Sequence, residues 1–223
     1  GVFNKWFWNF GDGATDAVKN PVHRYSTPSI NTITFFAQTD LGCYTDTIKK
    51  QIEIFAYPVI SAGPDLFVLD DGQKKTQATA AGRIISYTWT PSIYLSDTTI
   101  LQPIIIKPQE DTYYYLAVKG RGGCISKDTL FVVSLAMPKP PNTFTPNGDG
   151  INDTWEIKYL DQYEGCVVEI YSARGQLVFR NTGYVEPWNG TYKGQAVPVG
   201  TYYFVIDPKN GRKKIAGYVT ILR

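Results

Sequence analysis

Apolar residues along the chain come in short runs that alternate with polar positions and stop at turn residues, without long stretches of helical period. Val167–Tyr171 and Gln176–Arg180 flank a Ser-Ala-Arg-Gly turn, which predicts a β-hairpin. Thr201–Asp207 and Ile215–Leu222 flank an Asn-Gly turn and predict a second hairpin. Roughly seven strands in about 80 residues are typical of a small antiparallel sandwich. The pattern therefore predicts an all-β chain.

Two segments of the chain match each other at an offset of 81 positions. Trp8 and Cys43 in the first correspond to Trp89 and Cys124 in the second. An aromatic residue lies two positions before each tryptophan, so both rings of a pair share one face of a strand. An Asp-Thr-apolar triplet follows each cysteine. The match predicts two tandem copies of one β-sandwich module.

The repeat also predicts where each module begins. The second copy begins near Pro58, about 31 residues before its tryptophan, so the first should begin about 23 residues before Gly1. We therefore expect the first module to lack its opening strands, with open sheet edges and an unfilled core, and a larger protein upstream. The predicted domains are residues 1–57, 58–136 and 141–223. Residues 137–140 are a proline-rich linker, expected to be a stiff spacer that separates the last two domains.

The first copy carries two further motifs. Trp8–Gly13 reads WNFGDG, and Asn20–Tyr25 reads NPVHRY. In this order they resemble a PKD repeat, and Asp12-Gly13 is a tight-turn signal after an aromatic strand. The second copy has WTPS at Trp89–Ser92 instead and is similar to PKD or immunoglobulin-like modules. The resemblance implies a stalk that spaces or presents other domains and does not catalyse.

The last 83 residues contain three sequence blocks in a fixed order. These are TPNGDGINDTW near the start, WNGT from Trp188 with PVGTYY after it, and the terminal GYVTILR. Their order resembles the gliding-motility-associated C-terminal domain, the type B sorting domain of type IX secretion in Bacteroidetes. The segment departs from the family at IYSARGQ, where IYNRWGQ is usual, and at Asn189, where Asp is common. If the tryptophan of IYNRWGQ contacts the docking partner in relatives, that contact is altered in this chain, which has Arg174 at the position.

The resemblance implies a folded export signal. The protein would be secreted or placed on the cell surface of a Gram-negative, Bacteroidetes-type bacterium after export across the outer membrane. Its implied partners are an outer-membrane shuttle β-barrel and the type IX translocon channel. The last predicted strand is apolar on both faces, so it is interpreted either as buried in its own sandwich or as a docking strand. The docking candidates are Tyr218, Val219, Thr220, Ile221, Leu222, Arg223, Lys213 and Lys214.

Two further candidate sites rest on short motifs. The glycine-rich loop from Asn147 to Asp153 carries oxygen-bearing side chains, as calcium sites require, but Ile151 breaks the EF-hand pattern. A self-capped turn is the favoured interpretation, and no cofactor other than calcium is suggested. Asp-Thr-apolar and similar triplets resemble a Bacteroidetes O-glycosylation motif. The candidate calcium ligands are Asn147, Asp149, Asn152 and Asp153, and the candidate glycosylation sites are Thr47, Thr98 and Thr129.

No group of residues in the sequence has the types and spacing typical of a catalytic site. His23 is the only histidine and lies inside the PKD-type motif, where packing is its favoured role. The three cysteines, Cys43, Cys124 and Cys166, fall one per domain without a C-x-x-C motif, so zinc binding is not indicated. The net charge of +2 gives no argument for nucleic acid, and no apolar run approaches the roughly 18 residues of a membrane span.

The sequence thus predicts a non-enzymatic chain, the C-terminal part of a large secreted or surface protein with an adhesive or gliding-related passenger upstream. Two alternatives stay open. One is an array of carbohydrate-binding or adhesive modules that contacts cell-surface polysaccharide, and the other is the accessory tail of a secreted hydrolase. The first would use a sugar-stacking platform, although the period-2 spacing is better explained by sandwich cores. The aromatic residues concerned are Trp6, Trp8, Tyr87, Trp89 and Tyr113 to Tyr115.

Overall fold

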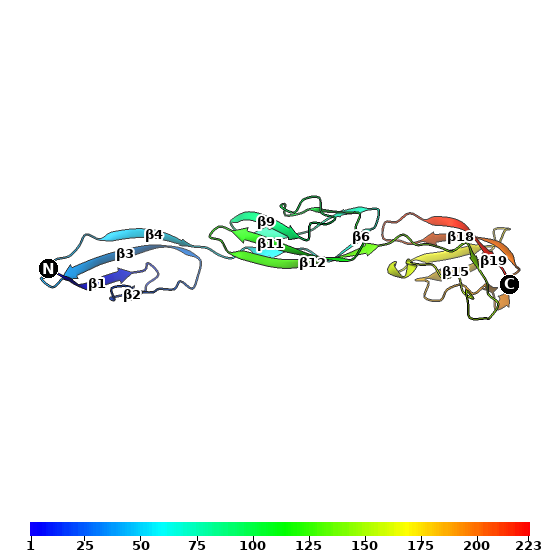
Figure 1. Cartoon of the computed structure of the whole chain (residues 1–223), viewed down its shortest axis with the longest axis horizontal. Coiled ribbons are helices and arrows are strands. Elements are labelled where there is room, and N and C mark those ends of the chain that lie inside the picture. Colours follow the sequence, from blue (N-terminus) through cyan, green and yellow to red (C-terminus); the bar gives the residue numbers. More distant parts are fainter.

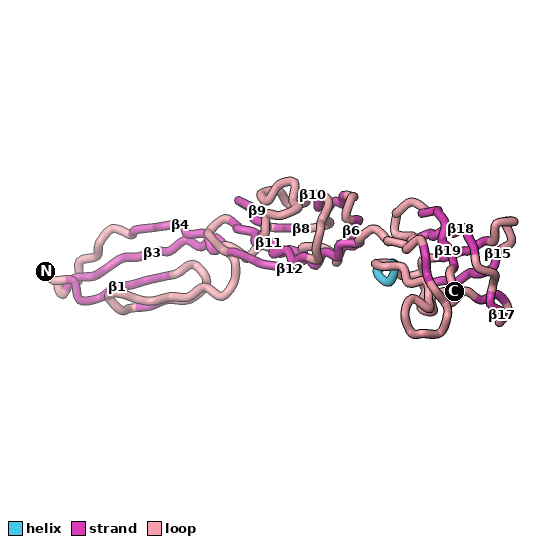
Figure 2. The backbone as a smooth tube through the Cα atoms, turned by 45° about the vertical axis from the view of Figure 1, so that its right-hand side comes forward, coloured by secondary structure: helices cyan, strands magenta, loops and turns pink.

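The computed structural model describes residues 1–223, which form three β-rich units arranged end to end as an elongated rod (Figure 1). The two termini lie at opposite ends of the rod. Strands and loops make up nearly the whole chain, and one short 3-10 helix, η1 (Leu160–Gln162), lies in the C-terminal unit (Figure 2). No helical segment has the length and apolarity needed to cross a bilayer. The prediction of an all-β chain is confirmed.

The N-terminal unit is a single antiparallel sheet. Only Phe10, Asn31 and Ala37 are buried, and the unit has no cluster of buried hydrophobic residues. Trp6 and Trp8 lie on one face of the sheet and are half-buried. The sheet order is β2-β1-β3-β4, with β1 (Phe3–Asn9), β2 (Thr15–Asp16), β3 (Ser29–Thr39) and β4 (Ile48–Ile54).

The middle unit packs a four-stranded sheet against two small ribbons. The sheet order is β6-β12-β11-β9, and β6 runs parallel to β12 whereas the other neighbours are antiparallel. The ribbons pair β5 with β8 and β7 with β10. The strand bounds are β5 (Val59–Ser61), β6 (Leu66–Leu69), β7 (Gln73–Lys75), β8 (Thr79–Ala81), β9 (Ile84–Thr90), β10 (Ile104–Ile106), β11 (Thr112–Gly120) and β12 (Ile125–Leu135).

The strand register confirms the internal repeat. Trp8 pairs with Phe35 across β1 and β3, and Trp89 pairs with Leu116 across β9 and β11, so both partners shift by 81 positions. Trp89 is fully buried, and its indole nitrogen donates to the carbonyl oxygen of Ile100 at 3.0 Å. The tryptophan face is covered in the middle unit by residues between positions 59 and 81, namely Ala62, Leu66, Val68 and Ala78.

The C-terminal unit contains the largest core of the chain, with 18 buried hydrophobic residues. Both predicted hairpins are present, as β14–β15 and β18–β19, because the Gly175 and Asn210-Gly211 turns supply the left-handed backbone that they need. The sheet order is β13-β19-β18-β14-β15, with a separate β16–β17 ribbon. The bounds are β13 (Thr143–Phe144), β14 (Val167–Tyr171), β15 (Leu177–Thr182), β16 (Thr191–Tyr192), β17 (Gln195–Ala196), β18 (Gly200–Asp207) and β19 (Ile215–Ile221).

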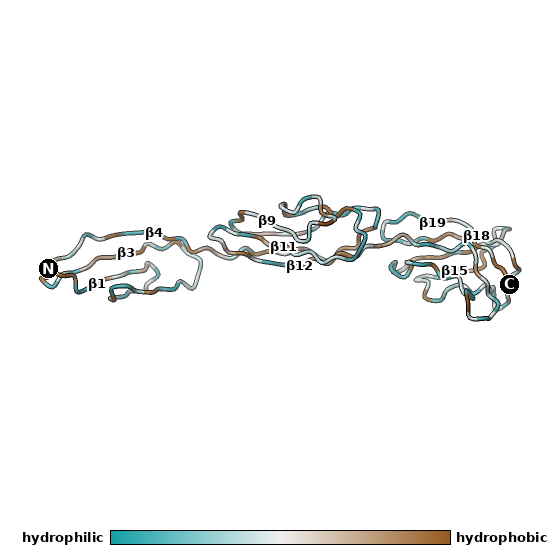
Figure 3. Tube along the Cα trace, viewed as in Figure 1, coloured by the Kyte–Doolittle hydropathy of each residue, from teal (hydrophilic) through white to brown (hydrophobic).

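The proline-rich stretch before β13 does not hold the last two units apart, contrary to the expectation of a spacer. Leu135, the last residue of β12, is buried inside the core of the C-terminal unit, and Leu69 and Val133 pack against that core. Hydrophobic positions therefore continue along the chain from the middle unit into the C-terminal unit (Figure 3). The middle unit contributes part of the C-terminal core because β12 runs on into it.

The two matched tryptophans should differ in their contribution to stability. Trp89→Ala removes a fully buried ring and should lower the free energy of unfolding by about 3–5 kcal/mol. Trp8→Ala removes a half-exposed ring in a unit without a buried cluster and should cost only about 1–2 kcal/mol. Urea denaturation of the 223-residue chain, followed by circular dichroism, measures both. Equal losses would contradict the difference in packing between the two copies.

Candidate docking surface of the C-terminal unit

The final hairpin uses its two faces differently. β18 and β19 pair from Gly200 opposite Ile221 to Ile206 opposite Ile215. Side chains alternate between the faces of a strand, so Val219 and Ile221 point inward and are fully buried. These two docking candidates are core residues, so they can affect partner binding only by stabilising the fold. Tyr218 and Leu222 lie on the outward face and are 54% and 52% exposed.

The outward face carries a row of tyrosines across three neighbouring strands. Tyr203 lies directly opposite Tyr218 on β19 and directly opposite Tyr171 on β14. Directly opposed residues of antiparallel strands project from the same face, so the three rings are neighbours. Tyr203 is 53% exposed, and Tyr171 donates its hydroxyl hydrogen to Glu169 at 3.0 Å. We call Tyr171, Tyr203 and Tyr218 the tyrosine row.

Of this row, only Tyr218 is among the docking candidates predicted from the sequence. The alternation within Gly200–Asp207 shows that Tyr203 and the buried Tyr202 face opposite ways, but it does not show which of them faces water. Tyr171 comes from a hairpin more than thirty residues away in the sequence, and only the strand register places it beside Tyr203.

The remaining hairpin candidates differ in what they contact. Lys213 and Lys214 are exposed in the loop between β18 and β19, and Lys214 lies 3.9 Å from Asp207. Thr220 is half-buried, and its amide donates to the carbonyl oxygen of Asn142 at 2.9 Å. Arg223 donates to the carbonyl oxygens of Val197 at 2.8 Å and Pro146 at 3.3 Å. Arg223 therefore fastens the end of the chain to two loops.

The three sequence blocks of the C-terminal segment meet at Gly190. A Cβ placed on Gly190 would lie 2.9 Å from Pro146, 3.4 Å from Ile221 and 3.5 Å from Phe144. Pro146 belongs to the first block, Gly190 to the second and Ile221 to the third. Gly190 also has a φ of 74°, which glycine adopts without strain. Although the three blocks are far apart in the sequence, each supplies one side of the same packed corner.

The departures from the family lie in turns. Asn189 accepts a hydrogen bond from the Thr191 hydroxyl at 2.7 Å, a role that an aspartate would also fill. Arg174, at the family's tryptophan position, is exposed at the tip of the β14–β15 turn and forms no ion pair. Ser172 accepts from the amide of Gln176 at 3.3 Å and closes the turn. The hairpin is therefore kept, whereas the chemistry at its tip is changed.

The loop from Asn147 to Asp153 is closed by its own carboxylates. Asp153 accepts hydrogen bonds from the amides of Asn147, Gly148 and Gly150 at 3.0, 2.7 and 2.8 Å. These backbone donors hold the pKa of Asp153 below its ordinary value. Asp149 accepts from the amide of Ile151 at 2.8 Å. The geometry is that of a self-capped turn, in which Asp149 and Asp153 already bind backbone donors. Asn152 contributes a left-handed backbone with φ of 54°.

The glycosylation candidates, His23 and two of the three cysteines lie outside the C-terminal unit and far from the tyrosine row in sequence, whereas Cys166 lies inside that unit. Thr47 and Thr129 are exposed and Thr98 is half-buried. His23 bonds to Asp12 at 2.7 Å and stacks on Phe10 with ring centroids 4.1 Å apart, so it joins the two PKD-type motifs. All three cysteines are free, with Cys43 exposed, Cys124 half-buried and Cys166 buried, and burial raises the pKa of the Cys166 thiol.

The aromatic residues proposed as a sugar platform do not form one surface. Trp89 and Tyr114 are fully buried, whereas Trp6, Trp8 and Tyr87 are half-buried. Tyr113 and Tyr115 lie on the outward face of β11 and are 56% and 54% exposed. No group of three or more His, Cys, Asp or Glu side chains is placed to hold a metal ion.

The architecture is a chain of three tandem β units, the last of which shares part of its core with the unit before it. Residues 138–221 match the family model of the CHU_C type IX secretion signal domain, and residues 1–54 match that of the PKD domain. These matches confirm both resemblances found in the sequence. The C-terminal unit is thus similar to an export signal, which supports a secreted or cell-surface protein that engages the type IX machinery.

Solved structures with a similar course of the chain are arrays of β domains. The chain aligns with the N-terminal eight immunoglobulin domains of DSCAM at 13% identity and TM-score 0.43, over 96% of this chain and 37% of that one. The D00-D0 domain of intimin aligns at 10% identity and TM-score 0.41, over 74% and 100%. Drosophila N-cadherin EC1-4 aligns at 9% identity and TM-score 0.35, over 98% and 65%. No curated protein matches the sequence.

Gly190→Ala should weaken the corner where the three blocks meet. The added methyl group would press on Pro146 and would force a residue with a Cβ into a left-handed backbone. We expect a loss of about 1–3 kcal/mol in the stability of the C-terminal unit. Gly194→Ala is the matched control, because Gly194 also has a positive φ but has open space around its Cβ position. Equal losses in urea denaturation would show that close packing at Gly190 is unimportant.

Asp153→Asn should change how stability depends on pH. The pKa of Asp153 is lowered in the folded state, so its contribution is present above the unfolded value and is lost as pH falls through the folded pKa. The wild-type chain should therefore lose stability below about pH 4, and the variant should lose less over that window. Denaturant midpoints at several pH values measure this. Asp161→Asn, at an exposed carboxylate without hydrogen bonds, should leave the wild-type slope unchanged.

Proposed function

We propose that the chain is the non-catalytic C-terminal part of a large secreted or cell-surface protein of a Bacteroidetes-type bacterium. In this proposal residues 141–223 act as a type B sorting signal, and residues 137–140 link them to the rest. Residues 1–57 and 58–136 form a stalk of PKD and immunoglobulin-like modules. The stalk connects the signal to an upstream passenger, an adhesin or a component of gliding.

One observation carries the proposal beyond the family match. The C-terminal unit buries one face of its final hairpin in the largest core of the chain and leaves the tyrosine row on the other face. Exposed tyrosines supply large contact area at little cost in side-chain entropy, and they are enriched at protein interfaces. The unit therefore presents a rigid aromatic surface on the side opposite its core.

The proposed partners are the outer-membrane shuttle β-barrel and the type IX translocon channel. The signal would be recognised as a folded unit, through the tyrosine row, the outward residues Thr220 and Leu222, and the charged loop at Lys213 and Lys214. Differential binding of this surface would commit the passenger to export. Recognition of an unfolded strand is less consistent with the burial of Val219 and Ile221.

A second function, contact with cell-surface polysaccharide, is favoured by one feature of the N-terminal unit. A cavity of about 400 Å³ is lined by Trp8, Phe10, His23 and Tyr25 among others. Trp8 and Tyr25 are half-exposed there, and aromatic rings beside polar groups are suited to stacking on sugars. The middle unit offers less support, because Trp89 is fully buried.

Replacing the tyrosine row should reduce export without unfolding the domain. We expect Tyr203→Ser combined with Tyr218→Ser, in the 223-residue chain fused to a fluorescent reporter with a periplasmic signal, to lower export about tenfold in a type IX-competent cell. Reporter fluorescence in the medium and on the cell surface, against total fluorescence, gives the exported fraction.

The middle unit supplies a closely matched control. Tyr113 and Tyr115 are 56% and 54% exposed on β11, against 53% and 54% for Tyr203 and Tyr218. Tyr113→Ser with Tyr115→Ser should leave export near the wild-type level. An equal drop in both double variants would point to lost stability or solubility, and no drop in the first would remove the tyrosine row from the docking surface. A wild-type fusion that is never exported would refute the proposed function itself.

A further inference from the structure

A buried arginine of the C-terminal unit binds an aspartate of the middle unit. Arg212 lies in the loop between β18 and β19, and its side chain is 4% exposed. Its Nη2 donates to Asp70 Oδ1 at 2.6 Å and to the carbonyl oxygen of Leu135 at 2.9 Å, and its Nε donates to the Tyr163 hydroxyl at 2.6 Å. Asp71 lies 3.4 Å from Nη1. The guanidinium therefore joins Arg212 to an aspartate that lies 142 positions earlier in the sequence.

Asp70 and two residues of the C-terminal unit, Gln162 and Tyr163, also bind the stretch of backbone that connects the two units. The second oxygen of Asp70 accepts a hydrogen bond from the amide of Met137 at 3.0 Å. Tyr163 donates its hydroxyl hydrogen to the carbonyl oxygen of Ala136 at 2.8 Å, and Gln162 accepts from the amide of Ala136 at 2.9 Å. The connection is thus bonded from both units and cannot turn freely as a linker would.

Apolar packing reinforces these polar contacts. Leu135 is buried in the C-terminal core, with Leu69 and Val133 of the middle unit packed against it. Parting the two units would remove Leu135 from that core and leave a cavity. It would also deprive the Arg212 guanidinium, which is always charged, of its carboxylate. Removing one member of a buried ion pair is strongly destabilising.

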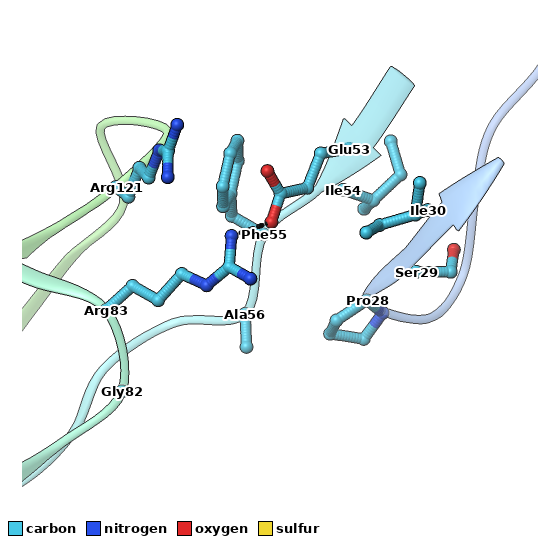
Figure 4. A pocket seen from close by; sticks show the side chains of 10 residues that line it. All are labelled: Pro28, Ser29, Ile30, Glu53, Ile54, Phe55, Ala56, Gly82, Arg83 and Arg121. Atoms are coloured by element: carbon cyan, nitrogen blue, oxygen red, sulfur yellow. Dashed lines mark hydrogen bonds and ion pairs between the residues drawn. The ribbon is translucent and has the colours of Figure 1, made fainter. Parts of the chain in front are cut away.

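The joint between the first two units differs in each of these respects. Arg83 pairs with Glu53 there, but their side chains are 59% and 28% exposed (Figure 4). Arg121 lies over the Phe55 ring at 6.0 Å, beside a cavity of about 290 Å³. Exposed ion pairs contribute little to stability. No buried hydrophobic cluster crosses this joint.

We propose that the middle and C-terminal units form one cooperative folding unit with a fixed mutual orientation, and that Arg212 is the residue that couples them. The end of the C-terminal unit that carries Arg212 is thereby an interaction surface for one kind of partner. That partner is an immunoglobulin-like domain with an acidic turn, to which Arg212 binds, after the first strand of its sheet. The secretion machinery then meets its signal in a single orientation relative to the preceding domain, a consequence that rests on the function proposed above.

The coupling can be measured on the purified 223-residue chain without any export assay. Its five tryptophans, replaced with 5-fluorotryptophan, report each unit separately by fluorine NMR during urea denaturation. Trp89 reports the middle unit, and Trp155 and Trp188 report the C-terminal unit. In the wild-type chain we expect the transitions of Trp89, Trp155 and Trp188 to coincide.

Asp70→Asn and Arg212→Lys should each separate these transitions. Either change should raise the unfolding equilibrium constant of the C-terminal unit about tenfold, less than for a wholly buried pair because the Asp70 side chain is 27% exposed. The double variant should lose less than the sum of the two single losses. Asp70→Asn is decisive, because the substitution lies in one unit and the expected shift is observed in the other.

Two controls and an orientation measurement complete the test. Lys213→Ala, at an exposed neighbour of Arg212, and Arg83→Lys, at the first joint, should leave the transitions of the last two units coincident. Residual dipolar couplings should fit one alignment tensor for both units in the wild type and two in Arg212→Lys. Separate transitions in the wild type, or an Asp70→Asn chain that behaves like Lys213→Ala, would overturn the proposal. Because export is not measured, neither result depends on the proposed function.

Discussion

The packing of Trp155 and Trp188 inside the C-terminal unit is the constraint on which its other features depend. Both rings are fully buried, and the amide of Trp155 donates to the carbonyl oxygen of Trp188 at 2.8 Å. Their indole nitrogens donate to the carbonyl oxygens of Pro141 at 2.7 Å and Thr191 at 3.0 Å. Since a buried indole needs an acceptor, the loops that supply these carbonyls are fixed by the core itself.

This core explains why the unit suits a role in recognition. A sheet that is held firmly on one face can present side chains on the other face in a constant arrangement. The inward residues of β18 and β19 are buried and define the position of the outward tyrosines. Little side-chain or backbone freedom is then lost on binding, which favours affinity at a given contact area. The outward face is therefore held rigid by residues that are themselves buried in the core.

The three units show how strongly a single β-sheet depends on a covering layer. The middle unit buries Trp89 under residues from 59 to 81, whereas the matching face of the N-terminal unit has only half-buried tryptophans. The two joints differ for a related reason. A shared core and a buried arginine fix the second joint, and an exposed ion pair marks the first. The rod thus has unequal joints, and the fixed one lies beside the unit that is similar to a secretion signal domain.

The amino-acid sequence by itself determined the all-β class, the tandem repeat, the two C-terminal hairpins and the similarity to a sorting domain. Each of these follows from local alternation, turn residues or the spacing of motifs, and such signals lie within short stretches of chain. The Asn147–Asp153 turn was foreseen for the same reason. Tyr171 and Tyr203 were missed, because strand register places them beside Tyr218 and no local pattern encodes that register.

Only the tertiary structure decided the rest. No local pattern marks Arg212, which lies in a loop beside two lysines, as a buried residue, yet it is buried against an aspartate 142 positions away. The stretch around Pro138 and Pro140 predicted a spacer, but Leu135 continues into the next core. Contacts between distant segments depend on which faces meet, and that choice is made by the burial of apolar surface over the whole chain. The sequence therefore determined the elements, and long-range packing determined the surface and the joint.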